Sequence, residues 1–324
     1  MDGEFFSGVD QVEASIAGHR AKMPVFYRDA RAFTLVLPAN LLALRRIMPD
    51  RRLVPAQMLP GVGAIHLTAF EYYDTDIEPY NEFAVGVLLN SQQFLQIPGY
   101  NMLRQLLQNS FCTYIYHLPV TTEIALRGGI DLYNYPKFMA SIDFEDTEEW
   151  VTCELAADDD LICRLRGRKI DANRSAVQKY FCSLYQFQQP QGAEFKVNAR
   201  KLAMAMGPGN AELVVGPSHP VGRELKSLLL STTPLMYIYQ PSIQAILYGP
   251  EHLSLASIAM FLEQGYGVSL DELSVLLERE KAGGRSTAKK PAKKAGGKAA
   301  GKPVAKKAVL PEEIDRAIGT APEE

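Results

Sequence analysis

The sequence GGIDLYNYPKFMA, residues 128–140, places a single lysine, Lys137, among tyrosine, phenylalanine and methionine. An amine that attacks a carbonyl must be neutral, and burial among apolar groups disfavours its charged form. Pro136, with its fixed φ, restricts the path of the chain into the residues that follow. The pattern predicts that Lys137 begins a strand, and it makes this lysine a candidate nucleophile. An edge-strand lysine whose stem covers aromatic neighbours would give the same pattern.

The residues on either side of this stretch, from 25 to 250, contain short runs rich in Val, Ile, Tyr, Phe and Thr, separated by Gly, Pro, Asn and Asp. Such runs are typical of strands. The predicted strands cover residues 32–37, 64–73, 83–89, 112–118, 137–144, 150–156, 162–168 and 212–216. The predicted helices cover residues 39–48, 100–108, 122–127 and 221–230. Many strands with few helices favour a barrel or sandwich, so the expected class is α+β on a largely antiparallel sheet.

Three motifs resemble the acetoacetate decarboxylase family. Tyr135-Pro-Lys137 is similar to the end of the family segment G-R-E-x-x-x-Y-P-K-K, which carries a Schiff-base lysine. Ala43-Leu-Arg-Arg-Ile-Met-Pro49 is similar to A-L-R-x-x-x-P, and Tyr80-Asn-Glu82 to Y-x-E. A weaker similarity lies at Gly216-Pro217. The likeness extends over residues 20–253 and implies a β-barrel or sandwich of the acetoacetate decarboxylase-like type with flanking helices.

The resemblance also implies a function. In that family a lysine amine condenses with a β-keto acid, the iminium accepts the electrons released as carbon dioxide leaves, and no cofactor is required. Lys137 takes the position of this lysine, and Glu82 that of a site glutamate that orients the substrate or moves a proton. Tyr80, Tyr135 and Phe138, beside these two positions, are expected to contact the substrate. An exposed turn glutamate after Pro79 is the alternative for Glu82.

Several positions depart from the family pattern. Phe138 stands where the family has a second lysine, and Gly129-Ile-Asp131 replaces G-R-E. Ala30 falls at the position of a site arginine. Arg28 and Arg31 flank it, so either is a candidate for binding the substrate carboxylate if a bulge or the strand register turns it inward.

A second site glutamate of the family maps near Leu67, with His66 and Glu71 as the nearest polar residues. Relatives with altered pockets use the same lysine for aldol addition and dehydration of keto acids, and the departures favour that alternative over decarboxylation of acetoacetate. A non-catalytic module that binds a small acid or a lipid-like ligand is a further alternative.

The commoner catalytic motifs are missing from the sequence. It contains no G-x-S-x-G, G-x-x-x-x-G-K-[ST], G-x-G-x-x-G or H-E-x-x-H pattern, and its five histidines lack metal-ligand spacing. Nucleotide and zinc chemistry are therefore disfavoured. The four cysteines show no C-x-x-C spacing, the first residues do not resemble a secretory signal, and no apolar run reaches the about 18 residues of a membrane span. A cytoplasmic location without a transmembrane segment is expected.

Charge is distributed unevenly along the chain. Residues 281–307 hold nine lysines, one arginine and no acid, so they contribute +10 to a formal net charge of −3. Residues 308–324 contribute −4, which leaves −9 for residues 1–280. The basic segment is expected to attract nucleic acid or another anionic surface. The alternative is a solvated segment that neutralises the acidic body.

These patterns divide the chain into four predicted parts. An acetoacetate decarboxylase-like domain covers residues 1–253, and a helical extension covers 254–281, where Ser269 and Glu272 form a capping box. Residues 282–308, rich in Lys, Ala, Pro and Gly, are predicted to be disordered because they cannot offset their ordering entropy. Residues 309–324 form a short acidic segment. The resemblance further implies a small keto-acid substrate and a homo-oligomer.

Overall fold

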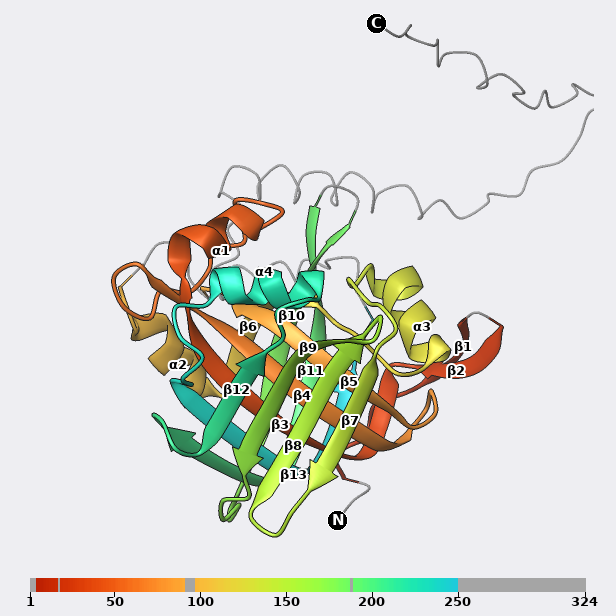
Figure 1. The fold of residues 1–324 in the computed structure, drawn as a ribbon. Helices are drawn as coiled ribbons and strands as arrows, with labels where there is room; N and C mark the ends of the chain where they lie inside the picture. Colours follow the sequence, from red (N-terminus) through yellow and green to blue (C-terminus); the bar gives the residue numbers. More distant parts are fainter. Residues whose placement is uncertain (1–3, 17, 91–96, 187–188, 250–324) are drawn as a thin grey trace, which may run out of the picture. The chain divides into compact units, whose positions relative to one another are not determined.

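The computed structural model describes residues 4–16, 18–90, 97–186 and 189–249, all within the first of the two units of the chain, Met1–Val275. A closed barrel forms the centre of this part (Figure 1). Around the barrel, its strands follow the order β10 (Arg174–Gln186), β11 (Gln189–Met206), β13 (Met236–Leu247), β3 (Val25–Asn40), β4 (Val62–Thr75), β5 (Tyr80–Leu88) and β6 (Ser110–His117). Neighbouring strands are antiparallel except β10 and β6, whose parallel pairing closes the barrel.

A second, four-stranded sheet packs on the outside of the barrel (Figure 1). Its order is β12 (Ala211–Val215), β9 (Asp160–Arg168), β8 (Trp150–Ala157) and β7 (Ser141–Asp146). Leu35, Ile65 and Phe83 of the barrel share one buried cluster with Val151 and Leu165 of this sheet. Because side chains alternate along a strand, the intervening residues of the same barrel strands face the barrel interior. The barrel strands are therefore apolar on both faces.

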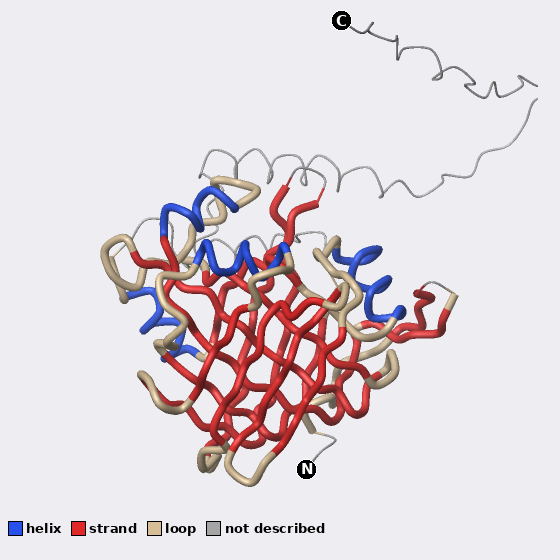
Figure 2. The backbone as a smooth tube through the Cα atoms, viewed as in Figure 1, coloured by secondary structure: helices blue, strands red, loops and turns tan. Residues whose placement is uncertain are grey.

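Helices and a hairpin lie around the strands, as Figure 2 shows in blue and red. The helices are α1 (Leu41–Ile47), α2 (Tyr100–Gln108), α3 (Glu123–Tyr133) and α4 (Pro220–Leu228), and the hairpin pairs β1 (Val12–Ile16) with β2 (His19–Met23). α3 packs on this hairpin, where Gly128 lies against Ile16. No helix among the described residues is both long and apolar enough to cross a membrane.

The predicted fold class, α+β with a largely antiparallel barrel and flanking helices, is confirmed. The predicted helix at 100–108 has the observed bounds, whereas the one at 122–127 is too short, since α3 continues through two glycines to Tyr133. The predicted strand at 137–144 is wrong in its first half, because β7 begins at Ser141. The sequence patterns also missed β1, β2, β10, β11 and β13. The predicted C-terminal helices, the basic segment and the boundary at 253 lie outside the described residues.

Candidate active site

A cavity of about 90 Å³ lies inside the barrel. Alternate residues of three neighbouring strands line it, as the two-residue period of a strand requires. These residues are His66, Thr68, Phe70 and Tyr72 of β4, Glu82 and Ala84 of β5, and Thr113 and Ile115 of β6. Aliphatic side chains from the hairpin and α3 contribute to the same wall. The cavity is therefore mostly apolar, with a few polar groups at fixed positions.

Lys137 and Glu82 form a buried ion pair in this cavity. Lys137 Nζ donates to Glu82 Oε2 over 2.7 Å, and the two side chains are 6% and 11% exposed. Lys137 follows α3, whose C-cap residue Asn134 has the left-handed conformation (φ 52°). The backbone of Pro136 then accepts from Leu118 N at 3.1 Å. This bond fixes the loop to the end of β6 and points Lys137 at Glu82 on β5.

Gly129 of α3 leaves the space that the stem of Lys137 occupies. A Cβ atom built at Gly129 would overlap Cδ and Cε of Lys137 and lie 3.1 Å from its Cγ. Carbon atoms in ordinary contact are about 3.5–4.0 Å apart. Gly129 is thus required by the close approach of Lys137, and not by its own backbone, which has no positive φ.

Three tyrosines surround the carboxylate of Glu82. The hydroxyl of Tyr72 donates to Oε1 over 3.4 Å, and that of Tyr80 to Oε2 over 3.5 Å. The hydroxyls of Tyr27 and Tyr80 lie 3.2 Å apart. Burial, reinforced by the charge of Glu82, raises the pKa of all three phenols well above the ordinary value. They therefore stay protonated and act as donors near the charged pair.

Lys137 also lies close to aromatic side chains of the cavity. Its Nζ is 5.9 Å from the ring centroid of Tyr80, within the range of a cation–π interaction. Tyr135, two residues earlier, is buried and stacks on Tyr133 with 5.3 Å between ring centroids. Cys182 of β10 lines the same wall, and burial raises the pKa of its thiol to about 12, so the thiol is neutral. Among the described lining residues, Lys137 is thus the group suited to nucleophilic attack.

His66 lies in the cavity wall beside two threonines. Its Nε2 is 2.8 Å from Thr113 Oγ1, and that hydroxyl donates to the carbonyl of Val87 over 3.2 Å. A hydroxyl has one proton to donate, so Nε2 must carry the ring proton and Nδ1 accepts from Thr68 Oγ1 at 3.2 Å. Burial lowers the pKa of His66 from 6.5 to about 4, which keeps the ring neutral. Gly86 makes room for it, since a Cβ there would overlap the ring.

The model of the family described as "Acetoacetate decarboxylase (ADC)" matches residues 14–226, well over half of the 324 residues. The chain belongs to the acetoacetate decarboxylase family. A search of curated proteins finds no match.

Fourteen chains of solved structures match the fold of this acetoacetate decarboxylase family member. One from structural studies of acetoacetate decarboxylase has 13% identity and a TM-score of 0.48, covering 70% of this chain and 87% of that chain. Acetoacetate decarboxylase from Legionella pneumophila has 12% identity and a TM-score of 0.49, covering 78% and 96%. The enduracididine biosynthesis enzyme MppR complexed with pyruvate has 12% identity and a TM-score of 0.47, covering 71% and 90%. The family assignment rests on the family match alone.

The structure of this acetoacetate decarboxylase family protein brings four of the residues proposed from sequence together. Lys137, Glu82, Tyr80 and Tyr135 all line the cavity. Glu82 lies in β5 and is 8% exposed, so it is not an exposed turn residue. Phe138 points elsewhere, since its ring stacks on that of His219 and packs against the sheet-facing cluster. Its predicted contact with a substrate does not match this position.

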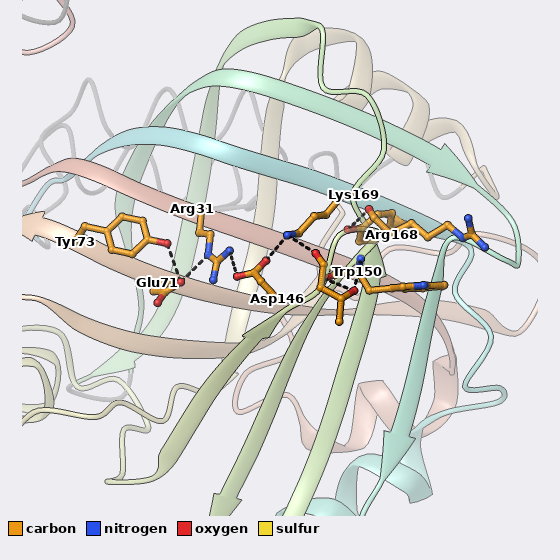
Figure 3. A network of polar contacts seen from close by, with 9 residues as sticks. Arg31, Glu71, Tyr73, Asp146, Trp150, Arg168 and Lys169 are labelled. Atoms are coloured by element: carbon orange, nitrogen blue, oxygen red, sulfur yellow. Dashed lines mark hydrogen bonds and ion pairs between the residues drawn. The ribbon is translucent and has the colours of Figure 1, made fainter.

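Arg31 does not line the cavity either, because it belongs to a polar network on the other face of the barrel wall (Figure 3). Its Nε lies 2.6 Å from Glu71, and its Nη1 lies 2.6 Å from Asp146 of β7. Asp146 also pairs with Lys169 at 2.8 Å, and Tyr73 donates to Glu71 over 2.8 Å. The network links the barrel to the four-stranded sheet. Glu71, a polar candidate from the sequence, belongs to this network and does not line the cavity.

Arg28 is also engaged outside the cavity, since its Nη2 lies 2.6 Å from Asp76. Ala30, between the two arginines, is buried on the inner face. The pairing of β3 with β4 does shift register on both sides of Asp29, but neither arginine is among the described lining residues of the cavity. Leu67 faces the outer sheet, whereas its neighbour His66 lines the cavity. Tyr27, Tyr72, Thr113 and Cys182 were missed from sequence, because only strand pairing, such as that of Tyr72 with Tyr80, brings them together.

Proposed function

We propose that the protein is a cofactor-free carbon–carbon lyase that forms a Schiff base between Lys137 and a small β-keto or α-keto acid. The observation that carries the proposal is the ion pair of Lys137 and Glu82, 2.7 Å apart inside an apolar cavity. The cavity volume, about 90 Å³, is below the roughly 150 Å³ that accommodates benzene, which favours a small substrate.

In this proposal the amine of Lys137 attacks the keto carbon and water leaves, which gives an iminium. The iminium accepts the electron pair of the carbon–carbon bond that breaks next to it. Glu82 takes the proton from Nζ before attack and returns one to the enamine carbon, a role that needs a carboxyl within hydrogen-bond reach. The Tyr72 and Tyr80 hydroxyls hold this carboxyl in place.

Two outcomes of the iminium remain in the proposal. Loss of carbon dioxide is the first. The alternative is loss of a proton from the carbon next to the iminium, which gives an enamine that attacks an aldehyde, followed by dehydration. In both outcomes the keto acid enters with its carboxylate, and the described lining residues include no arginine to pair with it.

Borohydride trapping with a panel of keto acids tests the proposal. Reduction of the iminium is expected to add the mass of the reduced keto acid to Lys137, located by peptide mass spectrometry. Lys137→Ala should lose the adduct, whereas Lys201→Ala, which removes an exposed lysine, should keep it. If no keto acid of the panel labels Lys137, the catalytic proposal fails, and the non-catalytic alternative of a module that binds a small acid or lipid-like ligand is favoured.

We also propose that residues 282–308 bind polyanions, on the evidence of their charge. Up to about ten phosphate contacts would give sequence-independent binding that weakens steeply with salt. Deletion of residues 282–324 should abolish binding to DNA at low salt and leave adduct formation at Lys137 unchanged. DNA binding that survives the deletion would exclude this role. A homo-oligomer and a cytoplasmic location remain predictions.

A further inference from the structure

The charges of the cavity balance without a ligand. Among its described lining residues, Lys137 and Glu82 form an ion pair. His66 is neutral because burial lowers its pKa to about 4, and burial keeps the tyrosines and Cys182 protonated. The protein thus contributes one positive and one negative charge, in direct contact, to the cavity.

A substrate carboxylate finds no second cation on this wall. Arg28 and Arg31, the basic side chains closest in sequence to the inner residue Ala30, are held by Asp76 and by Glu71 with Asp146. Figure 3 shows Arg31 directed along its network of acids. Moving Arg28 into the cavity would break its ion pair with Asp76, and moving Arg31 would take from Glu71 its ion-pair partner, which is costly for partly buried groups.

Schiff-base formation conserves charge for a neutral carbonyl compound. The ammonium of Lys137 and a ketone give an iminium and water, so one positive charge is replaced by another. A keto acid brings one extra negative charge, and the apolar cavity then holds two carboxylates beside one iminium. When two carboxylates share such a site, one of them retains a proton.

Glu82 is the carboxylate placed to hold that proton. The titratable groups that face it come from the barrel strands and from the Lys137 loop, and they are Tyr27, Tyr72, Tyr80, Tyr135, Lys137 and Cys182. Apart from Lys137, all of these are neutral donors or neutral thiols. None of them can supply the charge that would balance a second carboxylate.

We propose that the cavity binds a small keto acid that has one carboxylate and is otherwise apolar. The keto acid binds only if one proton is taken up with it, and Glu82 accepts this proton. This inference rests on the Schiff-base function proposed above. A neutral carbonyl compound of the same size enters without proton uptake. A dicarboxylic keto acid would require a second proton acceptor, and the described wall offers for this only His66, whose pKa burial lowers to about 4.

Pyruvate and pyruvamide form a matched pair of probes, because they have the same shape and differ in one charge. Borohydride trapping at Lys137 gives the concentration of each probe for half-maximal adduct between pH 5.5 and 8.5. Protonation of the amine affects the labelling by both probes equally. The ratio of the two concentrations, pyruvate over pyruvamide, therefore reports only the additional proton that pyruvate requires. The ratio is expected to rise about tenfold per pH unit wherever Glu82 is ionised in the free protein.

A direct measurement of proton uptake with a pH indicator should give about one proton per pyruvate bound at pH 8 and none per pyruvamide. In Glu82→Gln the ratio should lose its pH dependence. A ratio that is flat in the wild-type protein across this range, or pyruvate binding without proton uptake, overturns the inference while the Schiff-base function stands. If neither probe, nor any other keto acid, labels Lys137, the proposed function itself fails.

Discussion

Gly129→Ala tests whether the packing of α3 positions the amine of Lys137. The added Cβ would overlap Cδ and Cε of Lys137 and lie 3.1 Å from Cγ. An ordinary contact requires about 3.5–4.0 Å, so the lysine stem must move by about 1 Å. A displacement of that size at a reacting group can lower a rate about 100-fold. We therefore expect borohydride labelling of Lys137 with a keto acid to slow by about two orders of magnitude.

The fold should survive this change. Alanine exceeds glycine in helix propensity by about 1 kcal/mol, and overpacking costs about 1–3 kcal/mol, so the net loss in the free energy of unfolding should be below about 2 kcal/mol. Gly128→Ala is the matched control, since it has the same propensity gain and its Cβ would lie 3.3 Å from Ile16 Cδ1 and away from Lys137. It should label within about tenfold of the wild-type rate. Equal labelling of Gly129→Ala and wild type would refute the idea that α3 aims the amine.

The remaining predictions concern groups in and around the barrel wall. The pKa of His66 is about 4 in the folded protein and 6.5 without burial, so the unfolded state binds more protons between these values, and stability should fall as pH drops from about 6.5 to 4, by at most about 3 kcal/mol. Urea unfolding should show this loss in wild type and less of it in His66→Gln. Arg31→Met should lower the free energy of unfolding by about 1–3 kcal/mol, because Glu71 loses its ion-pair partner and Asp146 keeps only Lys169 of its two, with labelling of Lys137 unchanged. Slower labelling at unchanged stability would instead place Arg31 at the substrate. Phe138→Leu should likewise keep the labelling rate while costing about 1 kcal/mol of stability.

Much of the fold could be predicted from local pattern. Strands with period two and sharp punctuation, such as β4, β5 and β8, were found within a few residues. Long strands with mixed polarity were missed, and β11 is an example, since its lysines and arginine alternate with residues that face the core. The Lys137 loop was mistaken for a strand because Pro136 and its aromatic neighbours favour extended backbone. Its bonds to residues 118 and 120 give that extended shape without membership in a sheet.

The candidate site shows the same division between local and tertiary information. Lys137 and Glu82 could be found because short motifs mark them, and Tyr135 because it precedes Lys137. Tyr27 and Tyr72 carry no local signal, since their approach to Glu82 depends on the pairing of three strands. Arg28 and Arg31 were proposed from their spacing in the sequence, which does not show which face of the barrel wall a side chain occupies. Arg31 is adjacent to Ala30, so its side chain lies on the other face of the barrel wall, where it pairs with Glu71 and Asp146. Arg28 is two residues from Ala30, but the pairing of β3 with β4 shifts register on both sides of Asp29, and Arg28 pairs with Asp76.

The contact between Lys137 and Glu82 also changes the physical account of the amine. The sequence indicates apolar burial, which disfavours an ammonium, whereas a carboxylate 2.7 Å away favours one, so the two causes oppose each other. In the proposed mechanism the nucleophile forms when a proton passes from Nζ to Glu82. That transfer conserves total charge and removes both charges from an apolar cavity, where they lack the hydration that would stabilise them in water. Transfer of one proton within the ion pair therefore gives the neutral amine. The proton that Glu82 gains in this step is also the proton that it must hold when a keto acid brings a second carboxylate into the cavity.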